Sequence, residues 1–179
     1  ARADARVPQS RTLDFHLATC VAAARGGGRI VLDSWGRRGP FSVREKGRND
    51  FVTTVDHQAE EAIVRLIRTR FPDHAILAEE GGADGANDWL WIIDPLDGTT
   101  NFLHGFPHFA VSIAAQHKGK LQLGVIYAPC TQDLYVSIRG GGAVLNSRKI
   151  RVSKTVNMDE SLVGTGVPIR AGANLDSYL

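Results

Sequence analysis

The sequence is poor in cysteine and has no long apolar run. Cys20 and Cys130 are the only cysteines among 179 residues, too few for a disulfide framework, so a reducing, cytoplasmic compartment is expected. No stretch of about 18 apolar residues occurs, so we expect no transmembrane helix and no membrane partner. A hydrophobic content of 43% excludes intrinsic disorder as the main state of the chain.

Positive charge is missing from the middle of the chain. No Lys or Arg occurs between Phe71 and His117, although the net charge of the whole chain is +2. The same stretch holds seven acids, namely Asp73, Glu79, Glu80, Asp84, Asp88, Asp94 and Asp97. Carboxylates without nearby cations repel one another, so this clustering indicates either a bound divalent cation or a solvated acidic loop. For Asp84 and Asp88 we favour the solvated loop.

Hydrophobic periodicity predicts two helices followed by a series of strands. The helices are expected over 12–35 and 55–70, the second capped by Asp50 or Thr54. Strands are expected over 75–80, 89–94, 109–116, 121–128 and 133–138, with turns and short strands over 139–153. Loops are expected over 36–50, 81–88 and 95–108. This order favours an α/β (α+β) domain with a largely antiparallel sheet.

The segment DPLDGTT (94–100) follows an apolar strand and carries the chemistry of a cation site. Asp94 ends the strand, and Pro95 favours a sharp turn that would return Asp97 toward Asp94. The carbonyl of Leu96 is a further oxygen at that turn. Oxygen ligands with no cysteine nearby favour Mg²⁺ over Zn²⁺.

The same segment offers groups that suit a phosphate. Gly98 allows the backbone to approach a ligand closely, because it has no Cβ. A short helix beginning at Thr99 or Thr100 would present free amide groups to an anion.

At each of these acids, an ordinary structural role is the alternative to a cation site. Asp-Pro and Asp-Gly are also common turn sequences. Glu79 and Glu80 end a second apolar strand, and because strand side chains alternate, only one of them faces the cation. Asp56 is either an acid in the first turn of a helix, where the helix dipole favours it, or another candidate for the site.

Three motifs resemble, in order, those of the inositol monophosphatase family: KGRNDFVTTVD (46–56), ILAEEG (76–81) and WIIDPLDGTTNF (91–102). The likeness is closest to the bacterial SuhB-type members of that family, through FPHFAVSI (106–113). It runs from about residue 13 to the end of the chain.

The resemblance implies a layered α-β-α-β-α sandwich, shared with fructose-1,6-bisphosphatase, of which this chain is the N-terminal part. It also implies a homodimer. A mobile tail is expected over 1–11, and an N-terminal α+β metal-binding domain over 12–153. Residues 154–179 are expected to begin a C-terminal α/β portion that is missing from this chain.

The resemblance also implies a site that holds two or three Mg²⁺ ions and is sensitive to Li⁺. The implied metal ligands are Glu79, Asp94, the Leu96 carbonyl and Asp97. Glu79 and Thr99 would be catalytic, orienting or deprotonating the attacking water. Substrate contacts would come from Leu96, Asp97, Gly98 and Thr99, with Asp56, Glu80, Lys46 and Thr100 as secondary candidates.

The function implied is hydrolysis of inositol monophosphate to inositol and phosphate by direct attack of water, without a phosphoenzyme. One alternative keeps the chemistry and changes the substrate to fructose bisphosphate, a 3′-phosphonucleotide or histidinol phosphate. The other is a SuhB-like regulatory protein that binds RNA polymerase and antitermination factors, for which the basic residues within 37–48 offer weak support.

Two further absences concern the ends of the chain. The only methionine is Met158, so the sequence is expected to lack its natural start. The family carries another metal-binding Asp in a Trp-Asp dipeptide, and none occurs here. A chain that ended at Leu179 is therefore expected to hold its second Mg²⁺ poorly and to show little turnover.

Overall fold

A computed structural model describes residues 11–36, 43–47 and 50–164, so the expected mobile tail and the residues after 164 lie outside the described part. Its helices are α1 (Arg11–Gly36), α2 (Thr54–Arg70) and α3 (Thr99–Leu103), with a 3₁₀ turn at Met158–Glu160. Its strands are β1 (Val43–Gly47), β2 (Asp50–Thr53), β3 (Ala75–Ala78), β4 (Gly82–Asp84), β5 (Trp89–Asp97), β6 (Ala110–His117), β7 (Lys120–Ala128), β8 (Asp133–Ile138), β9 (Gly142–Leu145) and β10 (Arg148–Ile150).

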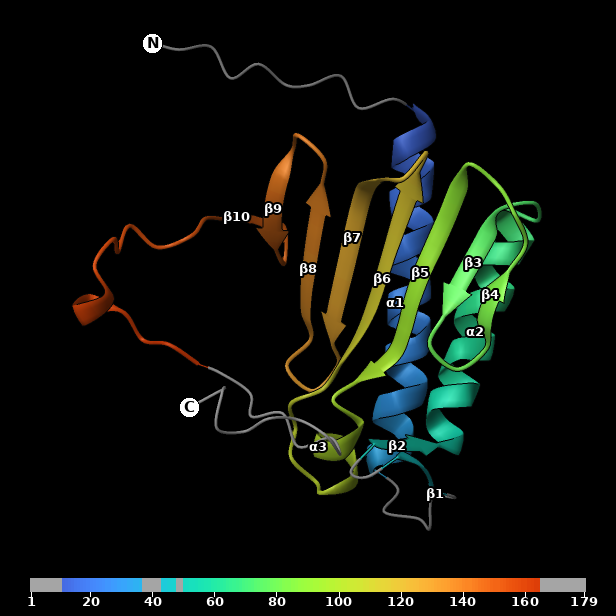
Figure 1. Cartoon of the computed structure of the whole chain (residues 1–179), viewed down its shortest axis with the longest axis horizontal. Helices are drawn as coiled ribbons and strands as arrows, with labels where there is room; N and C mark the ends of the chain where they lie inside the picture. The colour runs from blue at the N-terminus through green and yellow to red at the C-terminus, as the bar shows by residue number, and fades with distance from the viewer. Residues whose placement is uncertain (1–10, 37–42, 48–49, 165–179) are drawn as a thin grey trace.

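Eight strands form one sheet in the order β10-β9-β8-β7-β6-β5-β3-β4, and β1 pairs with β2 separately. Strands β3 and β5 run parallel, and every other neighbouring pair in the sheet is antiparallel. The largely antiparallel sheet predicted from the sequence is therefore confirmed. Figure 1 shows α1 and α2 side by side on one face of this sheet. The described residues thus form one helical layer on one sheet.

Helix α1 continues through Gly26, Gly27 and Gly28, although three glycines in a row weaken a helix. Close packing accounts for two of them. A Cβ at Gly27 would lie 2.7 Å from Cδ1 of Ile63, and one at Gly28 would lie 2.5 Å from Cδ1 of Tyr127. The glycines therefore let α1 approach both α2 and the sheet.

The core lies between the two helices and the sheet. Its large side chains include Trp91, which is fully buried, together with Ile63, Ile67, Val111 and Ile113. A smaller cluster around Phe102 and Leu96 lies under α3 and brings in Val31 from α1. The first cluster contains Trp91, near the start of β5, and the second contains Leu96, near its end. The predicted site lies at this second end.

The N-cap of α2 is Thr53, so the expectation of Asp50 or Thr54 was wrong. The Thr53 hydroxyl accepts hydrogen bonds from the amides of Val55 and Asp56, and Asp56 in return accepts from the Thr53 amide. This reciprocal capping box satisfies amide groups that the first turn of a helix cannot pair itself. Sequence spacing missed it because the box has Asp instead of Glu at its fourth position.

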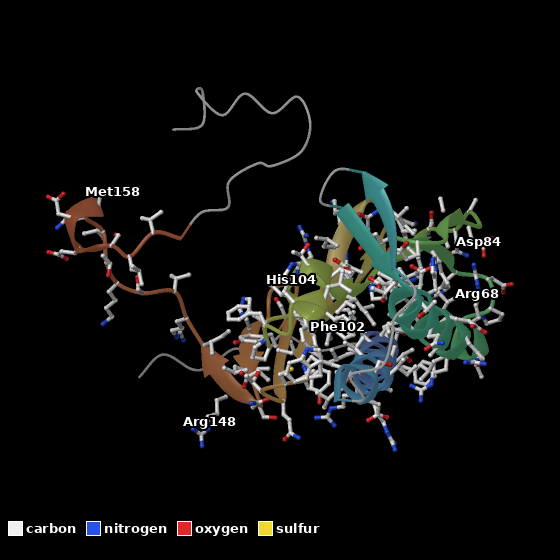
Figure 2. The ribbon with its side chains drawn as sticks, turned by 90° about the horizontal axis from the view of Figure 1, so that it is seen from below. Arg68, Asp84, Phe102, His104, Arg148 and Met158 are labelled. Atoms are coloured by element: carbon white, nitrogen blue, oxygen red, sulfur yellow. The ribbon has the colours of Figure 1, made fainter. Side chains whose placement is uncertain are left out.

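The acids of the predicted 81–88 loop lie apart from the candidate site. This segment contains the short strand β4, which the sequence did not predict. Asp84 forms an ion pair with Arg68, visible in Figure 2, and Asp88 forms one with Lys118 at 3.5 Å. Both carboxylates are exposed, so such pairs contribute little to stability. Their interpretation as surface acids is correct.

Residues 151–164 leave the sheet after β10 and are exposed throughout. Figures 1 and 2 show this segment, with Met158, well away from the sheet. The domain boundary expected near residue 153 stays a prediction. No helix among the described residues is long and apolar enough to cross a membrane.

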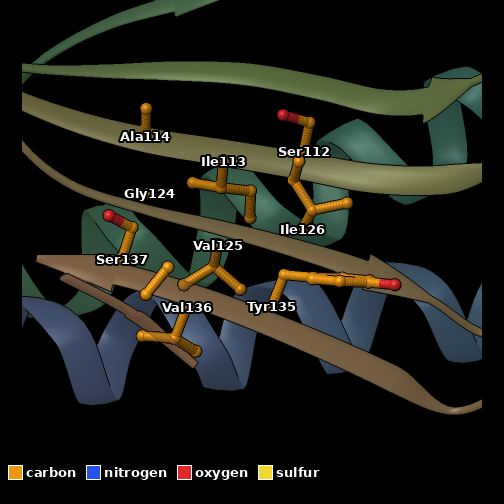
Figure 3. Close-up of a pocket in the computed structure, with 10 residues that line it drawn as sticks. Ser112, Ile113, Ala114, Gly124, Val125, Ile126, Tyr135, Val136 and Ser137 are labelled. Atoms are coloured by element: carbon orange, nitrogen blue, oxygen red, sulfur yellow. The ribbon is translucent and has the colours of Figure 1, made fainter. Parts of the chain in front are cut away.

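The face of the sheet opposite α1 and α2 has no helix from the described residues on it. A shallow depression of about 220 Å³ lies there, lined by residues of β6, β7 and β8 and by Ala143 of β9. Figure 3 shows the residues that line it. Ile126 and Tyr135 are 46% and 38% exposed on this face.

A stack of histidine and aromatic rings joins both helices to the sheet at the end of the molecule remote from α3. The ring of His16 lies 4.0 Å from that of Trp89 and 4.3 Å from that of Phe71. Nδ1 of His16 donates to the carbonyl of Thr12, so its buried Nε2 carries no proton and has no hydrogen-bond partner. Nε1 of the fully buried Trp91 donates to Nδ1 of His74 at 3.1 Å, which requires that this nitrogen be unprotonated too.

Both histidines therefore favour the neutral state. Burial lowers the pKa of His16. The hydrogen bond to the Thr12 carbonyl raises it, whereas the charge of His117 lowers it further. Burial also lowers the pKa of His74, where His16, Arg68 and His117 act in the same direction and Asp73 opposes them.

We expect the stack to lose stability in acid. A base with a lowered pKa binds fewer protons in the folded state than in the unfolded state below about pH 6.5, so its stabilisation is present above that pH and lost below it. In His74→Asn, the amide oxygen still accepts from Trp91 but does not titrate. The melting temperature of this variant should fall less between pH 7.5 and pH 5.5 than that of the wild type. Measurement by circular dichroism, with the exposed His57→Asn as control, checks this; equal slopes for all three proteins would contradict it.

Candidate metal and phosphate site

Two parallel strands bring Glu79 and Asp94 together. Ala78 of β3 lies opposite Ile93 of β5, and the amide of Glu79 donates to the carbonyl of Ile93 at 3.1 Å. The next residue of each chain segment is an acid. Because side chains alternate along a strand, both acids point away from the face that carries Ala78 and Ile93. The carboxyl ends of parallel strands therefore place the two predicted ligands on the same side.

The pKa of Asp94 reports how close these carboxylates are. Burial raises the pKa of Asp94 most, and the charge of Glu79, a side-chain hydrogen bond to Glu79 and the charge of Asp97 add to the shift, which together bring this pKa to about 7. The amide of Leu96 donates to Oδ1 of Asp94 at 3.1 Å and opposes the shift. Asp94 therefore binds a proton more readily than an isolated carboxyl group, which is the expected behaviour of a carboxylate placed beside others without a cation.

Asp97 reaches the site through a bulge and not through the sharp turn expected at Pro95. Asp94 pairs with Ser112 and Asp97 pairs with Ala110. An advance of three residues along β5 therefore corresponds to only two residues along β6. Strand β5 continues through this irregularity to Asp97, with Pro95 and Leu96 buried. A bulge redirects side chains at a strand end, which is how Asp97 comes within electrostatic range of Asp94.

Gly98 turns the chain from β5 into α3. Its φ is +89°, in the left-handed region that residues with a Cβ avoid. A Cβ at this position would lie 2.9 Å from the carbonyl oxygen of His108 and 3.3 Å from Cα of Phe109, so space also requires glycine. The helix then begins at Thr99, the first of the two starts considered for a short helix within the expected 95–108 loop, and runs for five residues. Its first amides are free of helical partners.

Thr99 joins α3 to α2 through Asp56. The hydroxyl of Thr99 lies 3.1 Å from Oδ1 of Asp56 and 2.9 Å from the carbonyl oxygen of Leu96, and it has one proton for the two acceptors. Oδ2 of Asp56 accepts from the Thr53 amide and hydroxyl, at 2.9 and 2.5 Å. Asp56 is 2% exposed. Asp56 is therefore an acid in the first turn of its helix, as one of the two interpretations has it, and it also contacts a predicted catalytic residue; its part in the cation site stays a prediction.

The remaining candidates are placed less directly. Thr100 is exposed, and its carbonyl accepts from His104. The amide of Glu80 donates to Oε2 of Glu60 at 2.8 Å. Sequence reasoning missed Glu60; its only signal is an acid one helical turn after Asp56. The side chain of Lys46 lies outside the described residues.

A polar cavity adjoins the site. It has a volume of about 500 Å³ and is lined in part by Asp97, Gly98, Asn101, His108 and Asp133. The amide of Asn101 donates to the carbonyl of His108 at 2.7 Å and holds the loop after α3 across the cavity. The cavity places free volume directly beside the first residues of α3.

The donor set fits a hard cation, although it is not a finished metal site. In the described part of the chain, no three His, Cys, Asp or Glu side chains are already arranged as metal ligands. Burial and the charges of Glu79 and Asp97 instead raise the pKa of Asp94. A divalent cation would displace the proton from Asp94 and relieve the repulsion among the three carboxylates. The chemistry of the donor set therefore supports Mg²⁺.

Comparisons with known proteins show which family and which solved folds the chain resembles. The model of the inositol monophosphatase family matches residues 13–177. The chain is 49% identical over 164 residues to the Nus factor SuhB of Pseudomonas aeruginosa, covering 88% of this chain and 60% of that protein. It therefore spans about three-fifths of the length of that curated relative.

Solved structures resemble the chain in the same way. The extragenic suppressor protein SuhB from Bartonella henselae superposes with a TM-score of 0.77 and 40% identity, covering 79% of this chain and 55% of that one. An inositol monophosphatase from Anabaena superposes with a TM-score of 0.69 and 38% identity, covering 80% and 52%.

Proposed function

The chain belongs to the inositol monophosphatase family and has its layered α/β fold, and from this premise we propose that it is a Mg²⁺-dependent phosphate monoester hydrolase. Inositol monophosphate is the substrate we expect. The observation that carries the proposal is the group of Glu79, Asp94 and Asp97 at the ends of β3 and β5, where burial and the charges of Glu79 and Asp97 raise the pKa of Asp94.

Glu79, Asp94, Asp97 and the Leu96 carbonyl would hold the metal ions. When bound, Mg²⁺ supplies positive charge that offsets the phosphate dianion, acidifies the attacking water and stabilises the leaving alkoxide. Li⁺ is expected to inhibit by competing at this site. The number of ions, two or three, depends on ligands beyond these four groups.

The chain's own residues would position the water and the phosphate. With its proton donated to Asp56, Oγ1 of Thr99 can accept a hydrogen bond from the attacking water, and Glu79 can accept the second. The free amides of Gly98 and Thr99 would receive phosphate oxygens. Water attacks phosphorus, the ester P–O bond breaks, and the leaving alkoxide takes a proton. No protein nucleophile is needed, so we expect no phosphoenzyme.

A substrate panel tests the proposal. The complete natural protein that contains this sequence is incubated with Mg²⁺ and inositol 1-phosphate, fructose bisphosphate, a 3′-phosphonucleotide or histidinol phosphate, and released phosphate is measured. We expect turnover that requires Mg²⁺, is lost with EDTA, and is highest with inositol 1-phosphate. Preference for another ester would change the substrate but keep the chemistry. Absence of Mg²⁺-dependent release from every ester would contradict the proposal.

A regulatory role is the second candidate, supported by the name Nus factor SuhB of a relative that is 49% identical. In this role the protein would act in the cytoplasm, as a homodimer, on RNA polymerase and antitermination factors. Capture of purified polymerase by immobilised Asp94→Asn protein, which should not turn over substrate, would separate this role from catalysis. Loss of capture in that variant would make binding depend on the active site.

A further inference from the structure

Glu60 is one of only two acidic side chains among the described residues that are buried, and the other is Asp56. The two lie four residues apart on α2, and so on the same face of the helix. Each contacts a segment that carries predicted metal ligands. Asp56 contacts Thr99, which follows β5, and Glu60 contacts the amide of Glu80, which follows β3.

From this arrangement we infer that Glu60 is a positioning residue that holds the Glu79–Glu80 end of β3 beside Asp94 for cation binding. The inference rests on the proposed function, because it assigns Glu60 a part in the same site. Glu60 would not itself touch the metal or the substrate. Helix α2 then serves as a rigid support whose two buried carboxylates fix the two ligand-bearing strand ends.

The hydrogen bond from the Glu80 amide to Oε2 of Glu60 is 2.8 Å long and joins an amide to a carboxylate. Such charge-assisted bonds are stronger than bonds between neutral groups. On the other side, the amide of Glu79 is bound to the Ile93 carbonyl at 3.1 Å. The backbone on both sides of the Glu79 carbonyl is thereby fixed, once to β5 and once to α2. This fixes the backbone position from which the Glu79 side chain projects beside Asp94.

The residue after Glu80 shows how closely Glu60 approaches the strand end. A Cβ at Gly81 would lie 2.9 Å from Oε1 of Glu60, closer than such atoms normally come. Gly81 is exposed, so no burial demands a glycine there. The close approach of the Glu60 carboxylate is the structural reason for a small residue at this position, and it offers a way to disturb the contact without removing the buried acid.

A purely structural role for Glu60 is the competing explanation, since any buried acid needs a partner. The two explanations differ in what Gln does at this position. The amide oxygen of Gln can still accept from Glu80, whereas Ala cannot. If Glu60 acts by holding the Glu80 amide in place, Mg²⁺ affinity should fall when this hydrogen bond is lost, as in Glu60→Ala. It should not fall when only the negative charge is lost, as in Glu60→Gln. Partners that orient metal ligands from behind typically change metal affinity by about 10- to 100-fold when removed.

The test uses the complete protein and its Glu60→Ala, Glu60→Gln and Gly81→Ala variants, with the exposed neighbour Glu61→Ala as control. Mg²⁺ affinity is measured by calorimetry, and protection of the Glu80 amide by hydrogen exchange without metal. We expect Glu60→Ala to bind Mg²⁺ about 10- to 100-fold more weakly and to lose protection at Glu80. Glu60→Gln should stay near wild type, Gly81→Ala should fall between, and Glu61→Ala should not change.

Different results would overturn the positioning role of Glu60 and the proposed function. Wild-type affinity in Glu60→Ala, or loss in Gln equal to that in Ala, would overturn the positioning role while leaving the proposed function intact. Failure of the wild type to bind Mg²⁺ would instead overturn the proposed function. If Glu60→Ala does not fold, Gly81→Ala keeps the buried acid and decides by itself: weaker Mg²⁺ binding with a less protected Glu80 amide supports the role, and unchanged binding refutes it.

Discussion

Replacing Asp94 with Asn is expected to lower Mg²⁺-dependent phosphate release by about a thousandfold or more while leaving the fold intact. A metal ion contributes several kcal/mol to stabilising the charge of a transition state, and about 1.4 kcal/mol corresponds to a factor of ten in rate. Asp94 is central among the predicted ligands, since its pKa responds to both Glu79 and Asp97. Released phosphate at saturating substrate is the measurement. Asp88→Asn, which removes an exposed acid outside the site, is the control.

The same substitution should make the metal-free protein more stable above neutral pH. An acid with a raised pKa binds more protons in the folded state than in the unfolded state, so its stabilisation is lost as pH rises through about 7. Asn removes that loss. Because Asp94 is partly exposed and solvent screens its charge, we expect a gain of only about 1 kcal/mol at pH 8 in urea unfolding with EDTA.

Two results would speak against this account of Asp94. An inactive Asp94→Asn protein that is also much less stable without metal would mean that the residue supports the fold. An active variant would remove Asp94 from the chemistry. A gain in stability together with a loss of activity is the combination that a metal ligand predicts and a structural carboxylate does not.

Replacing Asp56 with Ala is expected to damage both stability and turnover. The change removes the reciprocal half of the capping box of α2, worth about 1 kcal/mol, and leaves the buried amide and hydroxyl of Thr53 without their acceptor, at about 1–3 kcal/mol. We therefore expect about 3 kcal/mol less stability in urea unfolding. Turnover should fall about a hundredfold, because Thr99 loses the group that fixes its proton.

Asp56→Asn separates the two roles of Asp56. Its amide oxygen can still accept from Thr99 or from Thr53, so stability should recover in part, whereas its amide group cannot accept a proton passed on by Thr99. Turnover per folded molecule should stay low in Asn as well as in Ala. The exposed neighbour His57→Ala controls for changes in helix propensity. Recovery of turnover in parallel with stability would assign Asp56 a structural role alone.

Local sequence patterns predicted most of the architecture. Alternation and apolar runs located the strands that carry Glu79 and Asp94, because a strand needs only local information to be recognised. Helix α3 lies within the expected 95–108 loop, where the sequence offered Thr99 or Thr100 only as possible starts of a short helix. Strand β4 was missed because three exposed residues carry no periodic signal.

What the sequence could not provide was contact between distant segments. The pairing of β3 with β5 in parallel brings Glu79 to Asp94, and nothing local to either residue reports it. The role of Glu60 depends on an amide 20 residues away. The glycines of α1 look like helix breakers until Ile63 and Tyr127 are seen against them. Long-range packing, and not local propensity, decided each of these.

The ends of β3 and β5 are proposed to form a divalent-cation site, and every role assigned above to Glu79, Asp94 and Asp97 depends on it. The most direct measurement is calorimetric titration of the complete, metal-free protein with Mg²⁺ at pH 7.5, with Asp94→Asn and Asp88→Asn in parallel. We predict that the wild type and Asp88→Asn bind Mg²⁺ alike and release protons on binding, since the cation displaces the proton that Asp94 retains through its raised pKa. Asp94→Asn should bind at least tenfold more weakly, without that release. Equal binding by all three proteins, or none by the wild type, would contradict the claim.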